Sequence, residues 1–556
     1  MTGGETLTTS DDEPTRDVFD GKVGAQGSWG RTSLTFAALA VAIYAAARLW
    51  RLTSTCLWFD ELYSLHAARH GWGAMLRFTA ADLVHPPLFY ALLKVWAGAG
   101  GESLLWLRLL PALTAIACVA PFLLLCRELR LRPAETNLAL LLAAANGYLI
   151  KYAQELRMYS LLLLLTLCSL WLFARLLNDN GRRTPLALFV VNLLLVYTHY
   201  YGWLVLLSEC GFLLARARQK LRPFLLSLAA LVVCFAPWVY AVSNNPERGR
   251  GLEQNIGWVA RPRLAELAEA FALFHEPFYF RQSSGSAAPP YTRWSAPAGF
   301  LLFGVPLALL IRRRLRRPRD ASTRDDTSPA RDSLPAARDG IWLLLVCAFL
   351  PVASAFALSW ALPQSVWGTR HLIVAAAPYL LLASVAVSRL RADWLRVAVL
   401  SALGCWLFVG ALVTFARRER PPVWCAWEQL AGDLTREAAP AERSVTVFAF
   451  EDLVAYHLWF ALRPERDARF KVAVVKGVPG LTEDPAYFLP RGFDGVALAD
   501  ASALEGPRLW LAFRDASWDE TRPPLSLLKQ RGYTIGRVYE FDAQGQKAYL
   551  AEALQP

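Results

Sequence analysis

Long apolar runs alternate with short polar connections over most of this chain. Most runs are near the ~20 residues that a helix needs to cross the hydrocarbon core of a bilayer. We therefore predict a mostly α polytopic membrane protein with about eleven transmembrane helices. Their approximate bounds are 32–51, 104–126, 136–151, 157–177, 185–200, 202–217, 222–241, 296–312, 340–361, 371–389 and 396–416.

Basic residues are concentrated in every second connection between these runs. The positive-inside rule places such connections in the cytoplasm, which puts the N-terminus inside and residues 417–556 outside. Residues 1–31 are polar and lack the pattern of a cleavable signal peptide, so we predict a cytoplasmic tail and a retained first span. The basic clusters are Arg127, Arg130 and Arg132; Arg182 and Arg183; Arg216, Arg218 and Lys220; Arg312 to Arg319; and Arg389, Arg391 and Arg396.

The connections divide the chain into domains. Residues 32–416 are predicted to form the transmembrane domain, with long outward loops at 52–103 and 242–295. The apolar run 86–98 is too short to span and predicts a helix near the membrane surface. A helical stretch is expected near 262–275, and the Asp-, Arg-, Ser- and Pro-rich segment 318–338 reads as a disordered cytoplasmic linker.

Beyond residue 417 the pattern changes. Strand-like runs at 444–450, 471–475, 509–513 and 533–539 alternate with helical stretches near 424–438, 451–463 and 523–531. This alternation predicts a small extracytoplasmic α/β domain over residues 417–556. The domain carries no GxGxxG or P-loop motif, so we assign it no nucleotide.

Composition agrees with a membrane protein: 55% of residues are hydrophobic, 19% are charged, and mean hydropathy is +0.30. The formal charge of +12 does not indicate nucleic acid, because the basic residues fall in the short clusters between apolar runs. The nine cysteines show no metal-ligand spacing. A disulfide between Cys56 and Cys425 is one option, but packing as small apolar residues is the simpler expectation. His66 and His70 lack a third ligand nearby, and no metal is predicted.

Ionisable side chains from five separate segments fall on the outward side of this topology. Each could be an interfacial anchor, Glu155 and Arg157 could form a salt bridge, and Asp60 could cap the following helix. Convergence in one layer favours a catalytic site instead. The groups are Asp60 and Glu61; Arg108; Lys151, Tyr152, Gln154, Glu155, Arg157 and Tyr159; His199, Tyr200 and Tyr201; and Arg370 and His371.

Four motifs carry a resemblance. Trp58-Phe-Asp60-Glu61, His85-Pro-Pro-Leu-Phe-Tyr90, Arg108-Leu-Leu-Pro-Ala112 and Tyr152-Ala-Gln-Glu-Leu-Arg-Met-Tyr159 resemble the GT-C membrane glycosyltransferases. Within this superfamily, the motifs most resemble those of the protein O-mannosyltransferases and the lipid A aminoarabinose transferase, a branch similar to glycosyltransferase family 39. The resemblance covers residues 32–415. Gly368-Thr-Arg370-His371 is a looser match to an Arg-Tyr-Leu-Pro element, with His371 where tyrosine is usual.

The resemblance implies a bacterial inner-membrane enzyme with a polyprenyl-phosphate-linked sugar donor and a lipid, glycan or protein acceptor. It implies that Asp60 is the base and that Arg108 contacts the donor phosphate. Asp60 and Glu61 diverge by about 100° on a helix, so we assign one base and one positioning residue. The predicted donor-phosphate and substrate-binding residues are His85, Arg108, Lys151, Tyr152, Glu155, Arg157, Tyr159 and Arg370.

Two other classes of function stay open at this stage. A transporter or flippase for a lipid-linked or small solute would need charges facing the centre of the bundle, whereas these charges gather at one face. A non-catalytic assembly factor would use the C-terminal domain as its binding module. Within the glycosyltransferase hypothesis, we expect that domain to cap the outward site and to shape acceptor choice.

Overall fold

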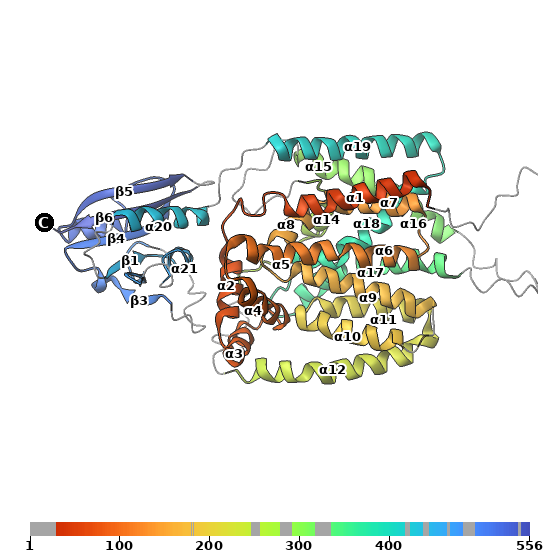
Figure 1. The fold of residues 1–556 in the computed structure, drawn as a ribbon, viewed down its shortest axis with the longest axis horizontal. Coiled ribbons are helices and arrows are strands. Elements are labelled where there is room, and N and C mark those ends of the chain that lie inside the picture. Colours follow the sequence, from red (N-terminus) through yellow and green to blue (C-terminus); the bar gives the residue numbers. More distant parts are fainter. Residues whose placement is uncertain are drawn as a thin grey trace, which may run out of the picture.

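The computed structural model describes most of the chain as a helical bundle beside a smaller sheet domain (Figure 1). The sheet domain packs at one end of the bundle, so the molecule is elongated along the helix axes. The residues described are 29–178, 181, 183–245, 256–278, 292–316, 335–416, 423–437, 444–463, 468–481, 495–542 and 546–555.

Eight helical segments in the described part of the chain are long and apolar enough to cross a membrane. This agrees with the predicted class of protein, a polytopic α-helical membrane protein. The segments are α1 (Arg31–Leu49), α5 with α6 (Leu104–Ala117, Val119–Glu128), α9 (Tyr159–Asn178), η1 with α12 (Arg218–Lys220, Leu221–Ser243), α15 with η2 and α16 (Thr292–Gly299, Phe300–Gly304, Val305–Arg316), α17 (Pro335–Ala361), η4 with α18 (Thr369–Leu372, Ile373–Ser388) and α19 (Asp393–Ala416).

The other three predicted spans are helical but shorter, so the count of eleven stays a prediction. They correspond to α7 (Pro133–Ala145) with α8 (Gly147–Gln154), to α10 (Arg183–Thr198) and to α11 (Gly202–Arg216). Asn146 separates α7 from α8, because its side chain accepts a hydrogen bond from the Leu149 amide at 2.9 Å and starts a new helix.

Burial within the bundle separates central helices from peripheral ones. In α18, 89% of the most apolar window is buried, whereas the values for α1, α12 and α19 are 17%, 17% and 11%. Helices α19 and α12 accordingly lie on opposite outer edges of the bundle (Figure 1). Their exposed apolar side chains, such as Val233 and Phe408, suit contact with lipid, where an apolar surface carries no penalty.

Short helices cover the end of the bundle that faces the sheet domain (Figure 1). They are α2 (Phe59–Arg69), α3 (Trp72–Asp82) and α4 (Leu88–Gly100). The second long loop contributes α14 (Leu264–Leu273). The helices predicted at 86–98 and near 262–275 are therefore present. The predicted linker 318–338 falls almost entirely outside the described residues.

The C-terminal part forms a six-stranded sheet in the order β3-β2-β1-β4-β6-β5. The first four strands of this order are parallel, β6 pairs antiparallel with β4, and β5 pairs antiparallel with β6 at the edge of the sheet. The predicted α/β class is confirmed, although the sequence pattern missed β3 and β6. The elements are η5 (Val423–Cys425), α20 (Ala426–Glu437), β1 (Val445–Ala449), α21 (Asp452–Ala461), β2 (Phe470–Lys476), β3 (Ala497–Asp500), η7 (Ala501–Ala503), β4 (Arg508–Asp515), α22 (Leu525–Gln530), β5 (Thr534–Asp542) and β6 (Lys547–Leu554).

Alternating side chains give this sheet two apolar faces. Val447 and Ala449 of β1 belong to the core that includes α20 and α21, whereas Phe448 faces the separate core that includes α22. This follows from the two-residue period of a strand. Helix α21, on the first face, contacts α2 of the bundle.

A disulfide and aromatic contacts join the sheet domain to the bundle. Cys56 and Cys425 are disulfide-bonded, with their Cα atoms 5.3 Å apart, so the expectation that all cysteines pack as apolar residues was wrong for this pair. The rings of Phe59 and Tyr456 lie 6.1 Å apart. His66 lies against Trp459 at 5.8 Å between centroids, as part of an aromatic contact between α2 and α21.

Candidate active site

Asp60 lies in the first turn of α2, at the end of the bundle that faces the sheet domain. Its carboxylate oxygen Oδ2 accepts a hydrogen bond from Arg370 Nη1 at 2.8 Å and lies 4.0 Å from Arg157 Nη2. The Asp60 side chain keeps 15% of its surface exposed and that of Arg370 keeps 27%. Two residues 310 positions apart in the chain therefore form a partly accessible ion pair.

Glu61 points away from Asp60, into the core, and its side chain has no exposed surface. Its Oε2 atom accepts hydrogen bonds from the Trp58 amide at 2.9 Å and from Arg108 Nη2 at 3.0 Å. Its Oε1 atom accepts one from the Leu156 amide at 2.7 Å. Glu61 thus ties the start of α2 to the turn after α8, which fits a positioning residue and not a base.

Arg108 is occupied by the same structural network. Its Nη1 atom donates to the carbonyl oxygens of Leu52 and Thr55, and its Nη2 atom donates to Cys56 O at 2.8 Å and to Glu61. Only 6% of its side chain is exposed. The geometry does not favour the predicted contact of Arg108 with a donor phosphate, because both terminal nitrogens already hold the loop before α2.

Arg157 is buried between α2 and the loop that carries His85. Its Nη1 atom donates to Asp60 O at 3.1 Å and to Ser64 Oγ at 2.9 Å, and its Nη2 atom lies 3.2 Å from His85 Nε2. The other ring nitrogen of His85 is 2.8 Å from Asp82 Oδ2. Burial, followed by the charge of Arg157, lowers the pKa of His85, so this imidazole is neutral at pH 7.

Lys151 and Glu155 form a second ion pair nearby, with Nζ and Oε1 3.7 Å apart one helical turn along the chain. Burial raises the pKa of Glu155, and the charge of Lys151 opposes this shift. The Lys151 ammonium also lies 5.3 Å from the centre of the Tyr152 ring. Glu155 is thus in a salt bridge, but its partner is Lys151 and not Arg157, the partner that the alternative reading had named.

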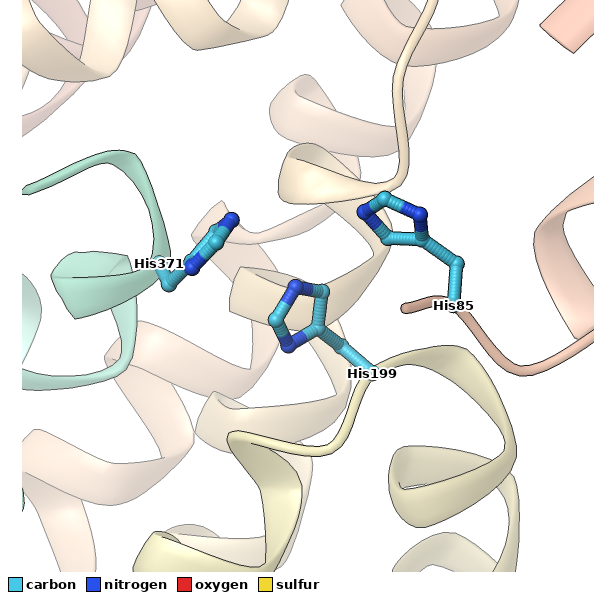
Figure 2. Close-up of side chains that lie close together, drawn as sticks. All are labelled: His85, His199 and His371. Carbon is cyan, nitrogen blue, oxygen red and sulfur yellow. The ribbon is translucent and has the colours of Figure 1, made fainter. Parts of the chain in front are cut away.

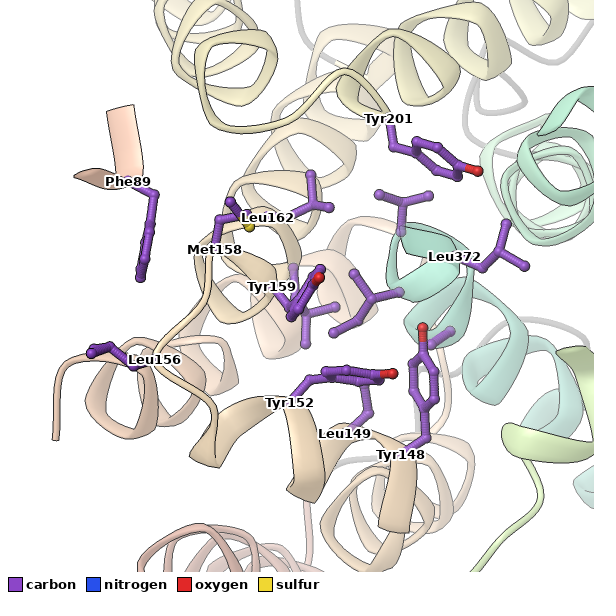
Figure 3. Packing of buried hydrophobic residues seen from close by; sticks show 14 of the residues in the cluster. Phe89, Tyr148, Leu149, Tyr152, Leu156, Met158, Tyr159, Leu162, Tyr201 and Leu372 are labelled. Atoms are coloured by element: carbon purple, nitrogen blue, oxygen red, sulfur yellow. The ribbon is translucent and has the colours of Figure 1, made fainter. Parts of the chain in front are cut away.

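Tyrosine rings pack together beside the helical turn that carries Leu372 (Figure 3). The ring of Tyr152 packs edge-on against both Tyr148 and Tyr159, each at 4.9 Å between centroids. The Tyr148 hydroxyl donates to Thr369 O at 2.7 Å, which fixes the turn that presents Arg370. Tyr152 and Tyr159 therefore occupy the predicted region, as part of a packed aromatic cluster.

The structure brings most of the predicted residues to one end of the bundle, but it also adds residues that the sequence reasoning did not select. Asp82, Ser64 and Tyr148 hold His85, Arg157 and the Arg370 turn, respectively. The three-residue spacing of Asp82 and His85 is a signal that could have identified the first of these. Nothing local in the sequence marks Ser64 or Tyr148, whose partners are distant along the chain.

The bundle of apolar helices, the short helices over one end and the partly buried ion pairs there define a polytopic membrane protein with a GT-C-like fold. Two structures of ArnT from Cupriavidus metallidurans, one bound to undecaprenyl phosphate and one in the apo state, have this architecture. Each has a TM-score of 0.50 and 14% identity, and the alignment covers 93% of this chain and 97% of ArnT.

The archaeal oligosaccharyltransferase of Archaeoglobus fulgidus, in its apo form, gives a TM-score of 0.47 at 13% identity, over 78% of this chain and 64% of that protein. No protein-family model matches the sequence, and no curated protein matches it. The comparisons thus show the fold of the chain.

Proposed function

We propose that this chain is an integral membrane glycosyltransferase that moves a sugar from a polyprenyl-phosphate donor to an acceptor hydroxyl on the extracytoplasmic face. The observation that carries the proposal is the Asp60 carboxylate, partly exposed and set between Arg370 and Arg157. The similar fold of ArnT, which was captured with undecaprenyl phosphate, supports a lipid phosphate as the leaving group.

In this proposal Asp60 is the general base. The acceptor hydroxyl must lose its proton as its oxygen attacks the anomeric carbon, and a carboxylate within hydrogen-bond reach accepts that proton. The adjacent Glu61 does not compete for this role, because all of its surface is buried against donors of the protein.

Arg370 is the proposed phosphate ligand, and Arg157, which is buried and already holds Ser64 and His85, adds its positive charge behind it. Negative charge grows on the phosphate as the bond to the sugar breaks, and fixed guanidinium groups stabilise that charge. Without donor, Arg370 is paired with Asp60 at 2.8 Å. Donor phosphate would compete for this guanidinium and release the Asp60 carboxylate toward the acceptor, so donor binding would prepare the base.

An apolar groove along α12 supports a lipid-linked substrate. It has a volume of about 620 Å³ and is lined by residues of α12 together with Trp203 at the start of α11. Trp203 is only four residues from His199, in the turn that borders the site. A groove of this kind suits the isoprenoid chain of a donor whose phosphate reaches Arg370.

The change Arg370→Lys tests the phosphate role. We expect weaker binding of undecaprenyl phosphate and slower transfer, because lysine keeps the charge but loses the planar, two-pronged donor geometry of arginine. Binding can be measured with purified protein in nanodiscs. Arg261→Lys is the matched control, since Arg261 is exposed and its guanidinium donates to the Leu362 carbonyl oxygen and lies over the Trp360 ring. Unchanged affinity and turnover in Arg370→Lys would show that Arg370 does not bind the phosphate and has only a structural role in its ion pair with Asp60.

We also propose that the N-terminus is cytoplasmic and that the site and the sheet domain are extracytoplasmic. The basic connections support this orientation. The disulfide between Cys56 and Cys425 supports it independently, because disulfides persist in oxidising compartments. Reporter fusions after Arg316 and after Gln555 should report opposite compartments. Activity of both reporters in one compartment would contradict the topology.

The sheet domain is proposed to cap the site and to influence which acceptor reaches Asp60. Its helix α21 packs on α2, the helix that carries Asp60. Arg463, which follows α21, lies 4.0 Å from Glu102 of the bundle. These contacts, together with the disulfide between Cys56 and Cys425, support a sheet domain that is fixed next to the site.

A further inference from the structure

Three histidines from three separate turns converge beside the proposed phosphate ligand (Figure 2). One ring nitrogen from each of His85, His199 and His371 lies within 4.8 Å of those of the others. His85 and His199 are buried, and His371 is half-buried. Such a cluster suits either of two ligands: a divalent metal, which needs imidazole lone pairs, or an anion, which needs imidazole N–H groups.

The hydrogen bonds of the rings distinguish these two ligands. His85 Nδ1 faces the Asp82 carboxylate and carries the proton, so its Nε2 lone pair accepts from Arg157 at 3.2 Å. His199 Nδ1 accepts a hydrogen bond from the Tyr201 amide at 3.1 Å. A neutral ring whose Nδ1 atom accepts carries its proton on Nε2. Both lone pairs are thus already used by protein donors, and metal binding would require breaking both contacts.

The Nε2–H group of His199 is the opposite case: it is a donor without an acceptor. The residue is 98% buried, at 2% exposure, and among the described residues Nε2 has no hydrogen-bond partner. A buried polar group left without a hydrogen bond is destabilising. Both ring nitrogens of His371, whose ring centre is 4.6 Å from that of His199, also lack partners within the described chain.

The charge around the rings favours an anion as their ligand. The charges of Arg157 and Arg370 both act on His199 and His371. Two guanidinium groups repel a divalent cation and attract a phosphate. Gly368 permits the close position of His371, because a Cβ atom there would lie 2.7 Å from Nδ1 of that ring.

We propose that His199 Nε2–H, with His371 beside it, donates a hydrogen bond to the phosphate of the lipid-linked donor and completes the pocket formed by Arg157 and Arg370. This inference rests on the proposed function and deepens it by assigning a neutral donor to the leaving group. The bond strengthens as negative charge accumulates on the phosphate oxygens, so it contributes to transfer as well as to binding.

The test compares the binding of undecaprenyl phosphate with that of undecaprenol, its phosphate-free alcohol, by full-length protein in nanodiscs. His199→Ala should weaken undecaprenyl phosphate binding about ten- to hundredfold, because hydrogen bonds to charged groups are worth about 1.5–3 kcal/mol. Undecaprenol binding should not change. His199→Gln, which keeps an N–H donor, should recover part of the affinity. His70→Gln, in the same end of the bundle but outside the cluster, should bind both lipids as the wild type does.

Three results would overturn the proposal. An equal loss for both lipids in His199→Ala would show a packing role, and no loss for either would show no role. One zinc ion per chain in the purified wild type, lost in His199→Ala, would assign the cluster to a metal. Thermal stability of each variant excludes unfolding as the cause. If the wild type itself does not distinguish the phosphate from the alcohol, the proposed function fails. If the wild type does, and His199→Ala distinguishes the two lipids to the same extent, only this inference fails.

Discussion

Asp60→Asn is expected to lower sugar transfer by at least about 10²-fold, the usual contribution of a positioned general base. The amide cannot accept the proton of the acceptor hydroxyl at neutral pH. It retains the size of the carboxylate, and its carbonyl oxygen can still accept the hydrogen bond from Arg370. Turnover should therefore fall while donor binding and thermal stability stay close to those of the wild type. The measurement is transfer by purified protein at saturating donor.

Asp515→Asn is a suitable control for this variant. Asp515 ends β4 in the sheet domain, and its partly exposed carboxylate lies 3.7 Å from the guanidinium of Arg522, so it is also an aspartate beside an arginine. The same chemical change there should leave transfer unaffected. Near-normal turnover in Asp60→Asn would exclude the base role, whatever the control does.

Glu61→Gln is expected to have the opposite profile, a large loss of stability. Removing one partner of a buried ion pair costs about 3–5 kcal/mol, because the remaining charge is left uncompensated. Here Arg108 would lose the only carboxylate that it contacts within the described structure. The amide NH2 group of the new glutamine would also face the backbone N–H group of Trp58 or of Leu156, and two donors cannot form a hydrogen bond with each other. A strongly lowered Tm of the purified protein, or its loss during extraction, would show this effect.

A double variant separates charge from packing in this case. Arg108→Met combined with Glu61→Gln removes both charges, so it should be more stable than the sum of the two single changes implies. A Tm of Glu61→Gln equal to that of the wild type would contradict the positioning role. The two adjacent acids are therefore expected to differ: Asp60→Asn lowers turnover, whereas Glu61→Gln lowers the stability of the protein.

The sequence was sufficient for the features that depend on local pattern. Runs of about 20 apolar residues identify membrane helices because the hydrocarbon core has a fixed thickness. The strands and helices after residue 417 were recognised from periodicity in the same way. The region around Asp60 was located because its motif resembles GT-C enzymes. The antiparallel β6 was missed because its run, Lys547–Leu554, consists mostly of alanine, glutamate and lysine, which are depleted in strands.

The tertiary structure decided the roles of the polar residues, because these roles depend on partners far away in the chain. The sequence predicted that Asp60 and Glu61 point in different directions, but only packing against Leu156 and Arg108 shows which one is buried. Arg108 was expected at a phosphate, yet backbone carbonyls of the preceding loop occupy it. A carbonyl that accepts a hydrogen bond leaves no mark on residue identity, so composition and motif could not have revealed this.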